Sequence, residues 1–544
     1  MWARTIRARS CLMPRVTSNM PVQPALPTSQ YRTFVNTSSK STNDALQPYT
    51  ALNGRLDSKL LDAVNVLGFK QMTPVQQRVL TELPDWRSDC LVQAKTGTGK
   101  TVAFLLPTLH SILNGAAKVP RGQVSTLIIA PTRELAQQIA KSCDELTSTL
   151  DRPLECHIAV GGRARSSNLK KFLNGNPSVL VATPGRLLDY LSEPEAAMKF
   201  SNMKTLILDE ADTMLETGFL VSVKQILAAL PPKRTGWQGM CFSATIPPSV
   251  KDVLSVVLDH GYKSISTIDE NETPTIERIS QQHVIMPSVL DSVPTLASLL
   301  EHETKKNSKI IVFASTANLT ALYYDVFSKG LLSLPVLEMH SRLSQKHREA
   351  ATAEFKAAKS GVLFASDVVG RGMDFPNVDL VIQVGLPDKS EQYVHRVGRT
   401  ARAGKGGRAI ILLTEGESWF LSKNPQFPIT PHPETAVINK SSPSYAGSVL
   451  KAMSQVEDIA KERAYTAYLG FLAASSRYKK LGIDKPGAVQ LANKWAVEGM
   501  GCPEPPAVKK VIVNKMGYKG VPGLRFMSQQ EIEARNAPGR PKRA

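Results

Sequence analysis

The sequence predicts an α/β protein with two tandem parallel-sheet domains, a helical C-terminal extension and disordered basic tails. Short apolar runs alternate with helix-compatible stretches from about residue 49 to residue 415, which is typical of parallel sheets with crossover helices. A polar connection at 272–280 interrupts this alternation, and beyond residue 416 the pattern becomes helical. The predicted segments are a first tail at 1–43, domains at 49–271 and 281–415, an extension at 416–506 and a last tail at 507–544.

Composition and charge exclude several classes of protein. No apolar run reaches about 18 residues, so we expect no transmembrane helix and no membrane partner. The six cysteines are scattered without a C-x-x-C pair, which argues against a disulfide framework or a zinc site. The net charge of +19 predicts a polyanionic partner, and the two tails carry +13 of it.

Apolar runs give the predicted strands in chain order. In the first domain they lie at 91–94, 126–130, 179–182, 205–209 and 240–243. In the second they include 309–313, 361–365, 380–384 and 408–413. The extension has helical patterns at 448–460 and 464–475, and the segment from 507 is rich in Gly, Pro, Lys and Arg, which predicts disorder.

A glycine-rich loop follows the first predicted strand and precedes a helix-compatible apolar run. It has the spacing of a phosphate-binding loop, although Ala94 occupies the first glycine position. Lys100 is expected to reach the β- and γ-phosphates and Thr101 to bind Mg²⁺. Taken alone, the stretch could also be an ordinary glycine-rich turn. The loop residues are Ala94, Lys95, Thr96, Gly97, Thr98, Gly99, Lys100 and Thr101.

The predicted strand at 205–209 ends in a group of acids, Asp209, Glu210 and Asp212. The carboxyl end of a buried strand is where open α/β sheets place their chemistry. Asp209 is expected to hold Mg²⁺ partly through water, and Glu210 to align and polarise an attacking water. Alternatively, the acids only begin a helix, where they favour the positive end of its dipole. Together with the phosphate loop in the same domain, they predict an NTPase.

A further motif at 68–77 precedes the phosphate loop and contains Phe69, Thr73 and Gln76. A glutamine side chain can pair with the N6 and N7 edge of adenine, which would select ATP over other nucleotides. As isolated residues, Thr73 and Pro74 predict an N-cap and a first helical position. Both interpretations can hold together, because the cap would keep Gln76 in place.

Several short motifs offer hydroxyls, backbone N–H groups at helix starts, or guanidinium groups to phosphate oxygens. Singly, each is more typical of a capped loop or, at 395–402, of a basic helix face. In the first domain they are Pro131, Thr132 and Arg133, Gly161 and Gly162, Thr183, Pro184 and Arg186, and the tripeptide Ser243, Ala244 and Thr245. In the second they are Gln345 and Arg348, then Ser366, Arg371 and Asp374, then His395, Arg399 and Arg402.

In this order, the motifs resemble those of the DEAD-box RNA helicases of superfamily 2, over roughly residues 50–415. The resemblance implies two RecA-like domains that share one ATP with Mg²⁺ and bind RNA. It assigns catalysis to Lys100, Asp209 and Glu210, with Arg399 and Arg402 as arginine fingers from the second domain. Phe69, Gln76, Asp374 and the phosphate loop would bind the nucleotide, and Asp212, the 243–245 tripeptide and His395 would couple hydrolysis to strand separation. The remaining residues of the short motifs would contact RNA.

Three residues of the second domain depart from the family pattern. Ser341 and Ala401 stand where relatives usually have glycine, and Ser366 stands where they usually have threonine. Ser366 keeps a hydroxyl, so its RNA contact is expected to survive.

The resemblance implies a monomeric RNA-dependent ATPase that closes on ATP and RNA and displaces one strand of a short duplex. One alternative is an ATP-gated RNA clamp without productive unwinding, which would share every motif. Others are a helicase for cytosolic or ribosomal RNA and a DNA-directed helicase, although the complete motif set argues against DNA.

The first 43 residues contain six Lys or Arg and no acid, and Arg4, Arg7 and Arg9 could share one side of a short helix. This composition predicts a transit peptide and import into the mitochondrial matrix. The alternative is a disordered arm that contacts RNA. With the helical extension and basic tail, the chain resembles the fungal mitochondrial members of the family, so structured RNA such as group I and II introns is the expected target.

Overall fold

A computed structural model gives the fold. It describes residues 46–536 apart from 84–85, 96, 152–153, 163–164, 217–218, 247, 269–278, 305–307, 368, 370–374 and 402–405. The predicted transit segment, most of the predicted linker, and the site residues Thr96, Arg371, Asp374 and Arg402 therefore lie outside the described residues.

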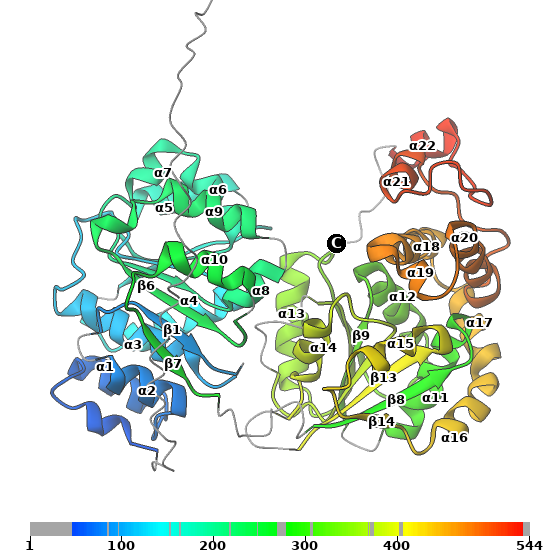
Figure 1. Ribbon diagram of the computed structural model, residues 1–544, viewed down its shortest axis with the longest axis horizontal. Coiled ribbons are helices and arrows are strands. Elements are labelled where there is room, and N and C mark those ends of the chain that lie inside the picture. Colours follow the sequence, from blue (N-terminus) through cyan, green and yellow to red (C-terminus); the bar gives the residue numbers. More distant parts are fainter. Residues whose placement is uncertain are drawn as a thin grey trace, which may run out of the picture. The chain divides into compact units, whose positions relative to one another are not determined.

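The first domain contains a seven-stranded parallel sheet in the order β3-β4-β2-β5-β6-β1-β7 (Figure 1). Its strands are β1 (Cys90–Gln93), β2 (Thr126–Ile129), β3 (Glu155–Ala159), β4 (Pro177–Ala182), β5 (Thr205–Leu208), β6 (Gln238–Ser243) and β7 (Lys263–Ser266). Its helices are α1 (Ser58–Val66), α2 (Pro74–Glu82), α3 (Lys100–Leu113), α4 (Arg133–Thr147), α5 (Arg165–Asn174), α6 (Pro184–Leu191), α7 (Pro194–Met198), α8 (Ala211–Glu216), α9 (Leu220–Ala229) and α10 (Pro248–Val257).

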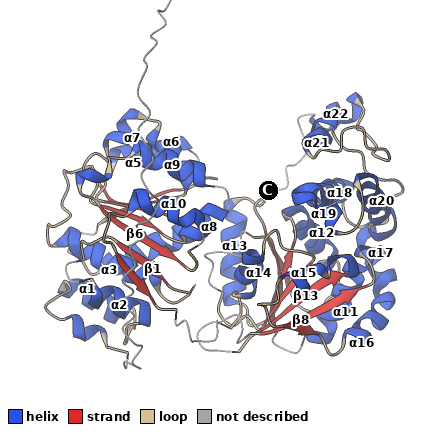
Figure 2. Cartoon of the chain, viewed as in Figure 1, coloured by secondary structure: helices blue, strands red, loops and turns tan. Residues whose placement is uncertain are grey.

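Helices cover both faces of this sheet (Figure 2), and the alternation of side chains along the strands explains why. Ile128 and Ile207 belong to a buried cluster with residues of helices α1–α4. Their neighbours Leu127 and Leu206 belong to a second cluster, with residues of α6, α9 and α10. The central strands are therefore apolar on both sides, as expected for a parallel sheet.

The second domain has another seven-stranded parallel sheet, in the order β10-β11-β9-β12-β13-β8-β14. Its strands are β8 (Ser280–Met286), β9 (Lys309–Ala314), β10 (Val336–Met339), β11 (Gly361–Ala365), β12 (Leu380–Val384), β13 (Arg408–Thr414) and β14 (Ile429–Pro431). Its helices are α11 (Ser292–Glu303), α12 (Ala317–Phe327), α13 (Gln345–Ala357), α14 (Ser390–Val397) and α15 (Trp419–Lys423).

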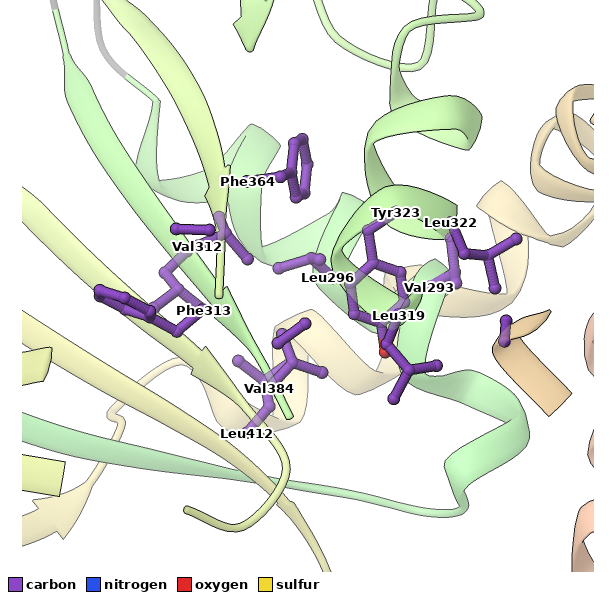
Figure 3. Packing of buried hydrophobic residues seen from close by; sticks show 14 of the residues in the cluster. Val293, Leu296, Val312, Phe313, Leu319, Leu322, Tyr323, Phe364, Val384 and Leu412 are labelled. Atoms are coloured by element: carbon purple, nitrogen blue, oxygen red, sulfur yellow. The ribbon is translucent and has the colours of Figure 1, made fainter. Parts of the chain in front are cut away.

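Figure 3 shows part of the core of this second domain. Side chains from its strands, including Val312 and Val384, lie beside Leu296 of α11 and Leu319 of α12. The same buried cluster continues into the C-terminal extension through residues such as Leu469. The extension is thus part of the core of the second domain rather than a separate unit.

The extension is helical, as predicted, but it also supplies strand β14 to the edge of the second sheet. Its helices are α16 (Thr435–Ser441), α17 (Ala446–Ser454), α18 (Asp458–Ala473), α19 (Arg477–Lys480), α20 (Lys485–Lys494) and a π-helical turn at Trp495–Gly499. The predicted fold class, two tandem parallel-sheet domains with a helical extension, is confirmed.

The prediction of disorder from residue 507 onward needs correction for residues 507–536. This stretch contains α21 (Lys510–Lys515) and α22 (Gln529–Asn536), and a bridge joins Val508 to Phe526. Val513 and Tyr518 are buried in the core cluster of the second domain. The segment is rich in charged residues, Gly and Pro, but a few widely spaced apolar side chains are enough to hold it on the extension.

Over the described residues, no helix combines the length and apolar character needed to cross a membrane.

Candidate functional site

Apart from the motif at 68–77, which precedes β1, each motif of the first domain follows the carboxyl end of a strand, so the sheet order decides which of these motifs lie together. Strands β5, β6 and β1 are neighbours, and they lead into the acids at 209–212, the tripeptide at 243–245 and the phosphate loop. Strands β3, β4 and β2 are also neighbours, and they lead into residues 161–162, 183–186 and 131–133. The residues predicted to bind the nucleotide therefore lie along one half of this edge of the sheet, and the residues predicted to contact RNA phosphates lie along the other, the phosphate-contact half.

The phosphate loop joins β1 to α3 and uses glycine where the backbone requires it. Gly97 and Gly99 have φ angles of +75° and +89°, in the left-handed region that other residues rarely adopt. Lys100 is the first residue of α3, and its Nζ donates a hydrogen bond to the Ala94 carbonyl at 3.0 Å. The lysine is buried across the loop, where the helix amino end adds positive potential.

Gln76 lies against the phosphate loop. Its Nε2 donates to the Gly99 carbonyl at 3.1 Å, and its Oε1 accepts from the Thr73 backbone N–H at 2.8 Å. Thr73 and Pro74 take the N-cap and first position of α2, as predicted. Gln76 is therefore held between the start of α2 and the phosphate loop.

Sequence reasoning missed Tyr49, which lies in a 3₁₀ turn (Tyr49–Leu52) ahead of these motifs. Its hydroxyl donates to Gln76 Oε1 at 2.7 Å, and burial raises the pKa of Tyr49 well above its usual value. A neutral hydroxyl thus fixes the amide orientation of Gln76. No motif signals this tyrosine, since the contact spans 27 residues.

The side chain of Phe69, a predicted nucleotide contact, is 42% exposed and available to an aromatic ligand.

The acids at the end of β5 are buried together. Burial raises the pKa of Asp209 to about 7; the nearby charge of Lys100 lowers it and that of Glu210 raises it further. Glu210 adopts a φ of +49°, which is strained for a residue with a side chain, and such strain is typical of functional sites. The donor set fits Mg²⁺, because the Asp209 carboxylate and Thr101 hydroxyl are oxygen ligands and a cation would offset the buried acidic charge.

Asp212 joins the acid group to the tripeptide after β6. Its Oδ2 accepts from the backbone N–H groups of Ala244 and Thr245, at 3.2 and 2.8 Å, and from the Thr245 hydroxyl at 2.9 Å. The Ser243 hydroxyl in turn accepts from the Asp212 N–H at 3.2 Å. Asp212 is buried, so a displacement of the tripeptide would break these bonds or move the Asp212 carboxylate with it.

In the other half of the edge, Thr132 caps α4 by accepting from the Leu135 N–H at 3.2 Å. Arg133, the next residue, lies against Gly161 and Gly162. A Cβ atom on Gly162 would lie 2.2 Å from Arg133 Nη1, so a larger residue there would require this guanidinium to move. Thr183 and Pro184 are the N-cap and first residue of α6, although the Thr183 side chain makes no capping hydrogen bond, and Arg186 Nε lies 3.4 Å from Asp189.

In the second domain, the structure brings together two predicted motifs. Ser366 and Asp367 follow β11, and Asp367 accepts from Arg396 of α14 at 2.8 Å. Arg399 lies just after α14, and its Nε donates to the His395 carbonyl at 3.1 Å. Arg399 is 2% exposed, and this bond holds it to a helix of its own domain. On α13, Arg348 donates to Gln345 Oε1, and both side chains are buried.

The structure also explains one departure from the family pattern. Ala401 has a φ of +56°, in the region that favours glycine. A glycine is therefore the unstrained residue at this position, and alanine is tolerated at a cost in stability. Ser341 is exposed at the end of β10, and nothing in the structure distinguishes it from glycine there.

Comparisons with known proteins agree with this arrangement. The DEAD/DEAH box helicase family model matches residues 73–253, and the helicase conserved C-terminal domain model matches residues 291–404. The ATP-dependent RNA helicase mss116, mitochondrial, of Aspergillus oryzae is 65% identical over 92% of this chain and 79% of its own length. The protein of the same name from Phaeosphaeria nodorum is 51% identical over 91% of this chain and 89% of its own.

The solved structures lead to the same family. The structure of Mss116p with its NTE and C-tail deleted, bound to ssRNA and AMP-PNP, matches with a TM-score of 0.73 and 26% identity. The match covers 88% of this chain and 97% of that one. With both domains, the motifs in family order and relatives of this identity, the chain belongs to the DEAD-box ATP-dependent RNA helicases.

Proposed function

We propose that this RNA helicase remodels structured RNA in the mitochondrial matrix and assists the splicing of group I and II introns. The observation that carries the proposal is the high identity to relatives whose names include both the helicase activity and the mitochondrion. The basic, acid-free segment at 1–43 supports import. The positively charged chain suits a structured RNA partner, and we expect the protein to act as a monomer.

In the proposed mechanism, the first domain binds ATP. Gln76, held by Tyr49 and Thr73, would read the adenine edge, and Phe69 would lie against the base. The backbone N–H groups of the phosphate loop would receive the phosphates, and Lys100 would turn from the Ala94 carbonyl toward them. Mg²⁺, held by Thr101 and Asp209, would supply charge neutralisation at the phosphates when bound.

Hydrolysis would use residues from both domains. Glu210 would orient the attacking water, which its buried position beside Asp209 suits. Arg399, with Arg402 by family resemblance, would stabilise the transition-state charge from the second domain. Such arginines contribute roughly 10³–10⁵ in rate in other NTPases. Since Arg399 belongs to the second domain and is bonded there to His395, it would have to reach a nucleotide bound on the first domain, which would make hydrolysis depend on closure.

RNA would favour this closure by contacting both domains. In the first, the phosphate-contact half of the edge offers Thr132, Arg133 and the N–H groups that begin α6. In the second, Gln345, Arg348 and Ser366 would contact the same strand. Asp212 and its bonds to the 243–245 tripeptide would transmit the state of the nucleotide toward the RNA half.

Strand displacement on a short labelled RNA duplex tests the helicase function. We expect ATP to accelerate release of one strand, and single-stranded RNA, but not DNA of the same sequence, to stimulate ATP hydrolysis. Tight ATP-dependent retention of RNA without any strand release would favour the clamp. Equal stimulation by DNA would contradict RNA specificity.

Import is tested separately with a fluorescent reporter fused to residues 1–43. We expect mitochondrial fluorescence for this fusion, and cytosolic fluorescence for a matched fusion in which the six basic residues are replaced by glutamine. A cytosolic location for the unaltered segment would contradict import by residues 1–43.

Splicing is tested by measuring unspliced intron RNA in mitochondria of cells depleted of the helicase.

A further inference from the structure

The C-terminal extension contacts the loop that begins helix α14, the helix that leads to Arg399. Arg477, the first residue of α19, donates a hydrogen bond from Nη2 to Asp388 Oδ1. Asp388 lies just before Lys389, the N-cap of α14. The arginine is 4% exposed, whereas the Asp388 side chain is 59% exposed, so the contact is presented by the extension to a surface loop.

Within the extension, Arg477 is fixed on several sides. Its Nη1 donates to the Phe471 carbonyl at 2.9 Å, and its guanidinium lies over the Phe471 ring at 4.2 Å. The residues before it, Ser475 and Ser476, have φ angles of +51° and +49°. Two consecutive strained serines are unfavourable by themselves, so the surrounding contacts must impose this turn. The guanidinium is therefore preorganised before it meets Asp388.

The contact bears on the position of α14. The Asp388 N–H donates to Gln392 Oε1, which ties the loop to the first turn of the helix. Asn424, which follows α15, accepts from the Ser390 hydroxyl at the same end. At the other end of α14, Arg399 follows the C-cap Gly398 and is bonded to the His395 carbonyl. A shift of the loop at residue 388 would thus change the direction in which α14 carries its arginine.

We propose that Arg477 is a positioning residue for ATP hydrolysis: through Asp388 it fixes the start of α14 and so the delivery of Arg399. This rests on the proposed role of Arg399 in the reaction. The extension then contributes to the rate of hydrolysis itself, in addition to completing the core of the second domain. The nucleotide is proposed to bind the first domain, so ATP affinity should not depend on this contact.

The test compares kcat and the KM for ATP at saturating single-stranded RNA. Asp388→Asn is the informative variant, because Asp388 is exposed and the protein should fold without its charge. A partly exposed ion pair contributes up to about 1 kcal/mol, so we expect kcat to fall about two- to fivefold. The KM for ATP and the melting temperature should stay close to those of the parent.

Two further variants separate positioning from general loosening of the extension. Asn318→Ala removes a bond from α12 to the Arg463 carbonyl of α18, which is a contact of the extension remote from α14. It should leave kcat unchanged. Combining Arg477→Met with Asp388→Asn should lower kcat no further than Arg477→Met alone, because both remove one interaction. Arg477→Lys should retain part of the rate.

The outcomes are distinguishable. If Asp388→Asn hydrolyses ATP at the parent rate, or if Asn318→Ala lowers kcat equally, Arg477 has only a structural role. Arg399→Ala, measured alongside, tests the function on which the inference rests. A parent-like rate in that variant would overturn the role of Arg399 itself, whereas loss of rate there with no effect at Asp388 would overturn the positioning alone.

Discussion

Replacing Gly99 by alanine should damage the choice of nucleotide, whereas the same change at Gly97 should not. Both glycines have positive φ angles, +89° and +75°, so alanine at either pays a similar backbone penalty of about 1–2 kcal/mol in folding. Their surroundings differ. A Cβ on Gly99 would lie 2.5 Å from Gln76 Nε2, and a Cβ on Gly97 would meet nothing within 4 Å.

The expected loss of preference for ATP depends on the hydrogen bonds that Gln76 would lose. The side chain is buried and bonded to Gly99, Tyr49 and Thr73, so moving it away from the new methyl group breaks hydrogen bonds of about 0.5–1.5 kcal/mol each. A displaced amide can no longer present its donor and acceptor to adenine, a pairing that contributes about 1–3 kcal/mol of discrimination. We therefore expect Gly99→Ala to lose about tenfold or more in preference for ATP over GTP.

The assay is the ratio of kcat/KM for ATP to that for GTP, at saturating single-stranded RNA. Effects on phosphate binding cancel in this ratio, because both nucleotides carry the same phosphates. Gly97→Ala serves as the matched control and should keep the parent ratio. In a Gln76→Ala background, Gly99→Ala should change the ratio no further. An equal loss of preference in both glycine variants would show that displacement of Gln76 is not the cause. A parent that uses GTP as well as ATP would show that Gln76 does not select adenine.

Three other predictions concern stability and the tail. Ala401→Gly should raise the free energy of unfolding by about 0.5–1 kcal/mol in urea titrations, because it relieves a positive φ of +56°; an unchanged midpoint would contradict the strain. Burial raises the pKa of Glu303, but hydrogen bonds and charges from Arg408 and His432 outweigh it and hold the pKa below the usual value of 4.5. That stabilisation is present above pH 4.5 and is lost as the pH falls through the lowered pKa, so Glu303→Gln should lower the melting temperature at pH 7 and flatten its acid dependence; parallel pH profiles would count against it. Truncation after Pro506 removes packed side chains and should lower the melting temperature. Truncation after Asn536 removes three basic residues, so the logarithm of RNA affinity should fall less steeply with the logarithm of salt concentration, by up to about 2 units, while the ATPase rate at saturating RNA stays unchanged. An unchanged slope would show that residues 537–544 do not contact RNA.

Sequence reasoning recovered the central strands of both sheets because their residues are apolar on both faces. Residues 126–129 and 205–208 are buried throughout, and the acids after β5 mark where the strand ends. Edge strands were missed for the converse reason. An edge strand pairs with a neighbour on one side only, so its residues are less enclosed and can be polar. Of the two edge strands of the first sheet, β3 contains Glu155 and His157, and β7 begins with Lys263. A strand this short and polar has no distinctive periodicity.

The candidate site was predictable where a motif is local and not where a contact is long-range. The phosphate loop, the cap at Thr73 and the acids at 209–212 are each contiguous; the structure places the loop after β1 and the acids after β5, with β6 between these two strands, and the cap at the start of α2. Tyr49 contacts Gln76, and Arg477 contacts Asp388 ahead of α14, from far along the chain, and no spacing rule links these pairs. The fold of residues 507–536 depends likewise on a few buried side chains, such as Tyr518, that composition conceals.

The role of Glu210 in hydrolysis is tested by comparing Glu210→Gln with the parent for ATP binding, ATP hydrolysis and RNA retention. The buried position of Glu210, beside Asp209 at the end of β5, suits it to orient water rather than to hold the nucleotide. We expect the variant to bind ATP with parent-like affinity, to hydrolyse it at a small fraction of the parent rate, and to retain single-stranded RNA for longer in the presence of ATP. Lys100→Ala is the matched control and should instead lose ATP affinity. A Glu210→Gln variant that hydrolyses ATP at the parent rate would show that Glu210 does not orient the attacking water.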